Sequence, residues 1–206
     1  MSVLVERDHV GIFGKMNAGK SSIMNLLTQQ ETSIVAAVPG TTADTKIALQ
    51  EIHGLGPVKL MDTAGLDEQG DLGAKKRQKT YRDLKECDLV ILVINPADKA
   101  WAAESDLLEK SRELDKQLLV VYNIFGQDEA VATALEKDLA PLRFYKKIIL
   151  RANDPRYRPA LLDFILQNYV PKQDKTELLP FVQRNEYYVL IIPMDEETPP
   201  GRYLRP

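Results

Sequence analysis

The chain has 206 residues, a formal net charge of −3, 44% hydrophobic and 28% charged residues, and a single cysteine. These proportions are typical of a globular protein; they argue against disorder and membrane insertion, and they provide no broad basic surface for attracting nucleic acid. The length suits one α/β domain, and the N-terminus has no signal-peptide core, so we expect a cytoplasmic protein.

The first part of the chain predicts a strand, a loop, a helix and then two more strands. The apolar run VGIFG precedes the glycine-bounded segment GKMNAGKSS, and SSIMNLLTQQ then places apolar residues at helical spacing. After the turn-rich segment AAVPGTTAD, the runs TKIALQEI and PVKLMD predict two strands joined at HGLG, where Gly54 and Gly56 favour a turn. The second of these strands ends at Asp62.

The later part of the chain alternates apolar strands with helices. The runs DLVILVIN, QLLVVYN and YKKIIL predict core strands, and AESDLLEKSRELDK, AVATALEKDLA and RPALLDFILQNY predict helices. This alternation predicts an α/β fold, a mostly parallel doubly wound sheet with helices on both faces and ligands at the carboxyl ends of the strands. We assign residues 1–170 to this domain.

The character of the chain changes after Tyr169. The polar, proline-flanked residues 171–180 predict a linker, and residues 181–206 form a tail that contains the strand-like run EYYVLIIP. An apolar edge strand tends to pair, so this tail is expected to add to a sheet edge or to pair with a second copy, if it does not remain frayed.

The segment GKMNAGKS matches the phosphate-loop pattern and lies between a predicted strand and a predicted helix. Its glycines let backbone N–H groups converge on phosphate oxygens at a helix N-terminus, its lysine can bridge the β- and γ-phosphates, and its serine hydroxyl can bind Mg²⁺. The predicted nucleotide-binding residues of this loop are Gly14, Asn17, Ala18, Gly19, Lys20, Ser21 and Ser22.

Two further segments predict contacts to the terminal phosphate. In DTAG, Asp62 can hold Mg²⁺ through water and the Gly65 N–H can meet the γ-phosphate; in PGTTAD, the Thr42 hydroxyl is a candidate Mg²⁺ ligand. Both segments are candidate switches, ordered by the γ-phosphate and released when it is cleaved. The predicted catalytic residues are Lys20, Thr42 and Gly65.

Together, GIFGKMNAGKSSIMNLL, PGTTAD and GPVKLMDTAGLDEQGDLG resemble the GTPase domain of the FeFe-hydrogenase maturation factor HydF, within the translation-factor-like class that includes Era and MnmE. The resemblance is strong from about His9 to Asn95. It implies a Ras-like P-loop fold, slow Mg²⁺-dependent hydrolysis of GTP to GDP as a switch, and a metallocofactor-assembly protein as partner.

The end of the chain, YYVLIIPMDEETPPGRYLRP, is similar to the start of that family's dimerisation domain, which implies a homodimer formed through the C-terminal strand. The family's cluster-binding domain, with its several cysteines and histidines, has no counterpart in this chain. We therefore expect no iron–sulfur cluster on it. The one thiol, Cys87, lies at the start of an apolar strand and is expected to be buried and inert.

The resemblance also implies that Asn17 binds K⁺ together with the backbone of the first switch, in place of an arginine finger; the alternative is an ordinary polar loop residue. Leu66 follows DTAG at the place where Ras-like enzymes carry a water-orienting glutamine. Positive charge near the bridging oxygen would then have to stabilise the transition state.

The guanine-reading segment departs from the family pattern. Guanine-specific GTPases have Asn-Lys-any-Asp after the strand that corresponds to QLLVVYN, whereas this chain has NIFG, so Gly126 replaces the carboxylate. Asn123 can still hydrogen-bond locally or to the base, and Asp128 can substitute for the lost carboxylate only if the loop bulges. After the next strand, Ala152 can offer its N–H to the base. We expect relaxed base selection rather than lost nucleotide binding.

Two other functions remain open. One is a nucleotide-gated interaction module with weak or no hydrolysis, and the other is an Era-like, RNA-linked GTPase, which the acidic balance of the chain makes less favourable. The basic run AKKRQKTYR predicts a solvated helix face more readily than a phosphate or partner patch.

Overall fold

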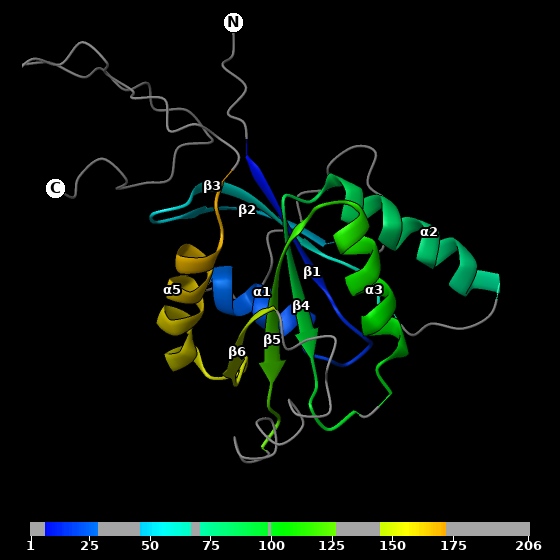
Figure 1. The fold of residues 1–206 in the computed structure, drawn as a ribbon. Coiled ribbons are helices and arrows are strands. Elements are labelled where there is room, and N and C mark those ends of the chain that lie inside the picture. The colour runs from blue at the N-terminus through cyan, green and yellow to red at the C-terminus, as the bar shows by residue number, and fades with distance from the viewer. Residues whose placement is uncertain (1–6, 29–45, 67–70, 99, 127–144, 172–206) are drawn as a thin grey trace, which may run out of the picture. The chain divides into compact units, whose positions relative to one another are not determined.

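The computed structural model describes residues 7–28, 46–66, 71–98, 100–126 and 145–171, drawn in colour in Figure 1; of residues 71–77 it describes only the backbone. The chain divides into two units, residues 1–173 and 174–206, and the described residues all belong to the first. Thr42, Asp128, the predicted helix at 130–140 and nearly all of the predicted linker and tail lie outside the described residues.

Six strands form one sheet in the order β2-β3-β1-β4-β5-β6. Neighbouring strands pair in parallel, except that β2 runs antiparallel to β3. Their bounds are β1 Asp8–Phe13, β2 Lys46–Ile52, β3 Gly56–Asp62, β4 Leu89–Ile94, β5 Gln117–Asn123 and β6 Lys146–Leu150. The six predicted strands and the mostly parallel sheet are thus confirmed.

The turn between β2 and β3 falls where the glycines predict it. Gly54 and Gly56 have φ angles of +87° and +95°, and the Leu55 N–H donates to the Ile52 carbonyl at 2.9 Å. Residues other than glycine rarely adopt such angles. The chain therefore reverses tightly here, and β2 returns along β3.

Helices cover both faces of the sheet, as Figure 1 shows: α1 and α5 lie on one face, α2 and α3 on the other. The two apolar clusters of the core agree with this arrangement. Leu27 of α1 and Leu161 of α5 belong to one cluster, and Leu84 of α2 and Leu107 of α3 belong to the other. The bounds are α1 Lys20–Thr28, α2 Asp71–Glu86, α3 Ala102–Glu113, a 3-10 turn at Pro155–Tyr157, and α5 Arg158–Asn168. Among the described residues, no helix combines the length and apolar character needed to span a bilayer.

The end of α3 differs from the sequence prediction, which continued the helix to Lys116. Asp115 adopts a left-handed conformation with a φ of 51°, its N–H donates to the Arg112 carbonyl at 3.1 Å, and the Lys116 N–H donates to the Ser111 carbonyl at 2.9 Å. This is the hydrogen-bond pattern of a Schellman motif, which ends a helix and satisfies its last carbonyls. The apolar periodicity alone did not reveal this stop.

Cys87 connects α2 to β4 and is fully buried, as predicted. Its thiol donates to the Asp83 carbonyl at 3.0 Å, and burial raises the pKa of the thiol far above its ordinary value. A thiol that stays protonated is a poor nucleophile. The structure therefore supports an inert, structural role for this residue.

Candidate nucleotide-binding site

The predicted phosphate loop lies between β1 and α1, at the carboxyl end of a strand in the middle of the sheet. Gly14, Asn17 and Gly19 have φ angles of +153°, +60° and +99°. A Cβ added to Gly14 would collide with the Val93 carbonyl oxygen, and one added to Gly19 would collide with the Asn123 amide nitrogen. Both glycines are thus required by the backbone path and by the close approach of neighbouring strands.

Lys20 is the first residue of α1, and its side chain is almost fully buried within the loop. Its Nζ donates to the carbonyl oxygen of Lys15 at 2.7 Å. The ammonium group is therefore held over the loop backbone, where a helix N-terminus also favours an anion. This position agrees with the predicted phosphate contact.

Ser21 and Asp62 meet at the side of the loop that faces β3. Ser21 Oγ donates to Asp62 Oδ2 at 2.6 Å, and Asp62 is the last, buried residue of β3. Thr63 fixes the following segment, because its hydroxyl donates to the Ile12 carbonyl at 2.8 Å. Hydroxyl and carboxylate oxygens are the ligand types that Mg²⁺ prefers, so the two side chains fit the predicted Mg²⁺ site.

The segment after Asp62 is tied to the phosphate loop through its backbone. The Leu66 N–H donates to the Gly14 carbonyl at 3.2 Å, and the Leu66 side chain packs against the apolar cluster that contains Phe13. Leu66 therefore points into the core and offers no hydrogen bond to a water molecule. Gly65, the predicted γ-phosphate contact, is half-buried directly before this tie.

Asn123 links the phosphate loop to the loops that follow β5 and β6. Its side chain is 1% exposed; Nδ2 donates to the Ala18 carbonyl at 3.0 Å, and Oδ1 accepts from the Ala152 N–H at 2.9 Å. The sequence left open whether Asn123 bonds locally or contacts the base. In this structure both ends of its amide make local hydrogen bonds. The loops after β5 and β6 are joined a second time, because the Ile124 N–H donates to the Leu150 carbonyl at 2.9 Å. The base contact predicted for the Ala152 N–H stays a prediction.

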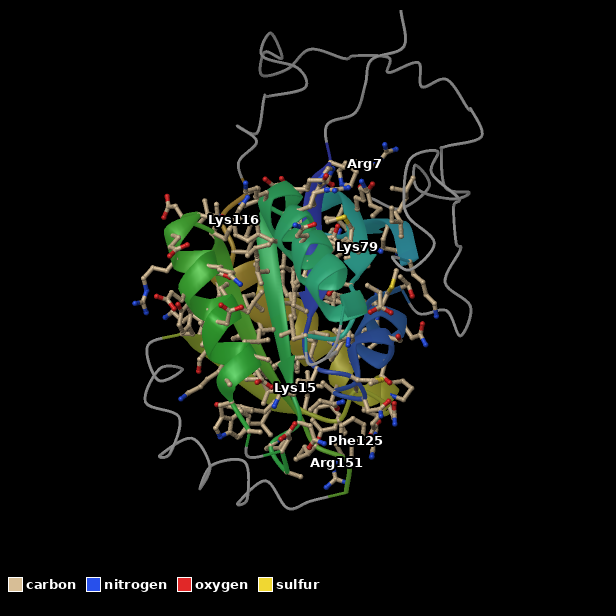
Figure 2. All side chains as sticks on the ribbon, turned by 90° about the vertical axis from the view of Figure 1, so that its right-hand side faces the viewer. Arg7, Lys15, Lys79, Lys116, Phe125 and Arg151 are labelled. Carbon is tan, nitrogen blue, oxygen red and sulfur yellow. The ribbon has the colours of Figure 1, made fainter. Side chains whose placement is uncertain are left out.

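The residues after Asn123 differ in exposure. Ile124 is buried, whereas Phe125 is 44% exposed, and its Cζ lies 3.2 Å from the position of a Cβ on Gly19. Gly126 follows with a φ of +96° and open space around it. Figure 2 shows Phe125 at the same end of the domain as Lys15 and Arg151.

Lys15, itself buried, is the centre of a charged cluster that the sequence analysis missed. It is 7% exposed; its Nζ donates to Asp98 Oδ2 at 3.0 Å and to the Ala100 carbonyl, and lies 5.9 Å from the centre of the Trp101 ring. A second carboxylate, Glu104 Oε2, lies 3.3 Å from Nζ. The cluster fastens the phosphate loop to the segment between β4 and α3.

The charges of this cluster shift one another's pKa values. Burial lowers the pKa of Lys15, but its hydrogen bond to Asp98 and the charge of Glu104 outweigh that effect and raise it. The Ala100 N–H, followed by the Lys15 hydrogen bond, lowers the pKa of Asp98, whereas burial raises that of Glu104. The only cue in the sequence was a lysine inside the loop, with two carboxylates more than eighty residues later.

A phosphate loop on β1, an adjoining serine–aspartate pair and a tethered segment after β3 define a P-loop nucleotide-binding protein with a Ras-like fold. Solved structures of Era share this fold. An Era variant from Aquifex aeolicus bound to GDP and AlF4− superimposes with a TM-score of 0.64 over 81% of this chain and 57% of that one, at 23% identity. Era in complex with MgGDPNP and nucleotides 1506–1542 of 16S ribosomal RNA gives a TM-score of 0.65 at 21% identity, over 82% of this chain and 59% of that one.

The family model described as 50S ribosome-binding GTPase matches residues 9–124, more than half of the chain. The chain belongs to this family and carries a GTPase domain similar in sequence to that of MnmE. The tRNA modification GTPase MnmE of Streptococcus pneumoniae is 38% identical over 57% of this chain, and that of Shouchella clausii is 38% identical over 67% of it. The chain spans 26% and 30% of the lengths of these two relatives.

Proposed function

We propose that this protein binds GTP with Mg²⁺ and hydrolyses it slowly to GDP and phosphate, and that the nucleotide state acts as a switch. The observation that carries the proposal is the 2.6 Å hydrogen bond between Ser21 and Asp62, beside the Lys20 ammonium on the same loop. It supports a site in which a phosphate cradle, a cation and a metal-binding pair converge.

The positions of the side chains support the proposed roles. The N–H groups of the loop and Lys20 bind the phosphate chain, and Ser21 with Asp62 holds Mg²⁺, which when bound neutralises charge on the phosphate oxygens. Thr42 is proposed as a further Mg²⁺ ligand from the first switch. The Leu66 N–H bond to Gly14 keeps Gly65 beside the loop, where its own N–H can meet the γ-phosphate.

The finer assignments rest on the sequence resemblance. We propose that Asn17 binds K⁺, that the C-terminal strand mediates a homodimer, and that the protein works in the cytoplasm with a metallocofactor-assembly protein of the HydF type. An RNA partner is the alternative, because MnmE is named as a tRNA modification GTPase and an Era structure contains ribosomal RNA. Salt-dependent binding of RNA by the full chain would favour that alternative.

The test is phosphate release from GTP and ATP by the full chain, in Mg²⁺ with KCl or NaCl. Wild-type protein is expected to release phosphate above the buffer rate, and Lys20→Ala is expected to abolish that release. Lys110→Ala, on the outer face of α3, is the matched control and should behave as wild type. Nucleotide binding without phosphate release would reject hydrolysis and favour the nucleotide-gated interaction module.

A further inference from the structure

We infer that Phe125 is a stacking platform for the nucleobase, so that this site binds a purine by its face and not by the edge that distinguishes guanine from adenine. The inference rests on the proposed function, because it concerns the base of the same bound nucleotide. It goes beyond that function by naming the group that replaces the missing carboxylate.

The position of the base follows from the two sides of the phosphate loop. Ser21 and Asp62 lie on the side toward β3, whereas Ala18 is bonded to Asn123 at the end of β5, on the opposite side of β1 in the strand order. A Mg²⁺ ion held by Ser21 and Asp62 would neutralise charge on the terminal phosphates. A nucleotide with its terminal phosphate near Asp62 therefore directs its base toward the loop after β5.

Asn123 and the Ala152 N–H, two groups on this side that could read the edge of a base, are engaged within the protein. Both ends of the Asn123 amide are bonded within the protein, and the Ala152 N–H is one of its partners. Gly126 carries no side chain, and Ile124 is 2% exposed. Of residues 124–126, the described loop directly after β5, the residue with a planar side chain is Phe125.

The Phe125 ring is held at the loop while much of its surface stays accessible. The tip of the ring reaches to 3.2 Å from a Cβ position on Gly19, so the ring lies against the phosphate loop, and 44% of the residue remains exposed. Figure 2 shows the residue at the loop end of the domain. An aromatic face binds any base, and purines better than pyrimidines because they offer more area to stack.

The test measures the affinities of the full chain for GDP, ADP, CDP and inorganic pyrophosphate by calorimetry. We expect GDP and ADP to bind with affinities within about tenfold of each other, both more tightly than CDP and pyrophosphate. Phe125→Leu keeps an apolar side chain against Gly19 but removes the ring. It should weaken GDP and ADP binding roughly 5- to 100-fold, the range for loss of one stacked base, and leave pyrophosphate binding unchanged.

Two variants complete the design. Phe125→Trp should restore or improve the affinity for both purine nucleotides, and Leu49→Ala, which alters a similarly exposed apolar residue on β2, should match wild type. Stacking would be overturned if wild type and Phe125→Leu bound GDP equally well. It would also be overturned if Phe125→Leu lost as much affinity for pyrophosphate as for GDP. Strong preference of wild type for GDP over ADP would overturn face-only recognition. If wild type binds none of the four, the proposed function itself fails.

Discussion

The ammonium group of Lys15 lies 3.3 Å from Glu104 Oε2, and the two side chains retain 8% and 3% of their exposure. The main-chain carbonyl of the same lysine accepts the Lys20 hydrogen bond. One residue thus connects Lys20, the proposed phosphate-binding lysine, to the first turn of α3. A buried ion pair is sensitive to loss of one partner, because the remaining charge stays in a poorly solvated place.

Removing the charge of Lys15 should therefore destabilise the fold, because this ammonium group compensates the buried Glu104 carboxylate. We expect Lys15→Met to lower the free energy of unfolding by about 2 kcal/mol, less than for an isolated, fully buried pair because Asp98 is partly exposed. Urea denaturation measures the change. The control is Lys110→Met, which removes an exposed pair with Asp106 on α3 and should change stability by less than about 1 kcal/mol. Equal midpoints for the two variants would contradict a structural role for the buried pair.

The Asn123 side chain should contribute strongly to the stability of the fold, because it joins two loops. Asn123→Ala leaves the Ala18 carbonyl and the Ala152 N–H without their partner, and each buried group left unpaired costs about 1–3 kcal/mol. We expect a loss of about 2–4 kcal/mol in the free energy of unfolding. Asn153→Ala, at an exposed position next to Ala152, is the control. A similar small effect of both changes would show that the connection between the loops is dispensable.

The Ser21–Asp62 pair should control the effect of Mg²⁺ on nucleotide binding. In EDTA, Asp62→Asn should bind GDP about as well as wild type, because the phosphate cradle is unchanged. Added Mg²⁺ should increase the affinity of wild type by at least about tenfold and that of the variant far less, since the carboxylate supplies the charge that holds the cation. Calorimetry in EDTA measures the binding of GDP without metal, and calorimetry with Mg²⁺ measures the gain in affinity that the metal gives. Asp163→Asn, on the exposed side of α5, is the control. An equal gain in GDP affinity on adding Mg²⁺ to wild type and to Asp62→Asn would place the metal elsewhere.

Features set by short segments were predictable from the sequence. The strands β4 and β5 read as continuous apolar runs because both of their faces are covered, and Ser21 could be paired with Asp62 because each has a fixed place in a short motif. The sheet then brings the two motifs together: β1 and β3 are neighbours. The geometry of such short motifs is determined by the residues of the motif itself.

Features that depend on long-range packing were not predictable in this way. Nothing next to Lys15 in the sequence indicates that its ammonium group is buried against Glu104, and Glu104 alone resembles any charged residue on an amphipathic helix. The same holds for Phe125, whose ring lies beside Gly19, more than a hundred residues earlier in the chain. The predicted roles of Thr42 and Asp128 stay predictions.

Cys87 gives a prediction with a defined pH dependence. Burial raises the pKa of the folded thiol above its ordinary value near 9, so the proton is held more tightly in the folded state than in the unfolded one. The stabilising effect is complete below pH 9 and decreases as the pH rises through the range between the two pKa values. Between pH 8 and pH 10 wild type should lose about 1.4 kcal/mol more unfolding free energy than Cys87→Ala.

Urea denaturation of wild type and Cys87→Ala at the two pH values measures this difference. The alanine variant is expected to be less stable than wild type at pH 8, because it loses the contact of the thiol with the Asp83 carbonyl and some packing. The comparison uses each protein's own change with pH, so this offset does not matter. Parallel changes in the two proteins would show that the thiol ionises as readily in the folded state as in the unfolded one.

Asn17 requires a test that separates its backbone from its side chain. Its φ of +60° lies in the left-handed region, which asparagine tolerates better than most residues, so conformation alone could account for its presence. Asn17→Gly keeps this backbone accessible and removes the amide oxygen. If the side chain binds K⁺, the variant should still bind GDP but lose the stimulation of phosphate release by KCl over NaCl. We expect that stimulation to be about tenfold or more in wild type, below the roughly 10³–10⁵ of an arginine finger.

Asn17→Ala is the companion variant, because it also lacks the amide but strains the backbone at positive φ by about 1–2 kcal/mol. It should lose K⁺ stimulation as the glycine variant does and should be less stable in urea as well. Retained K⁺ stimulation in Asn17→Gly would assign the residue a conformational role and leave the cation to backbone oxygens. Loss of stimulation in both variants, with stability lost only in the alanine variant, would assign the cation to the amide oxygen.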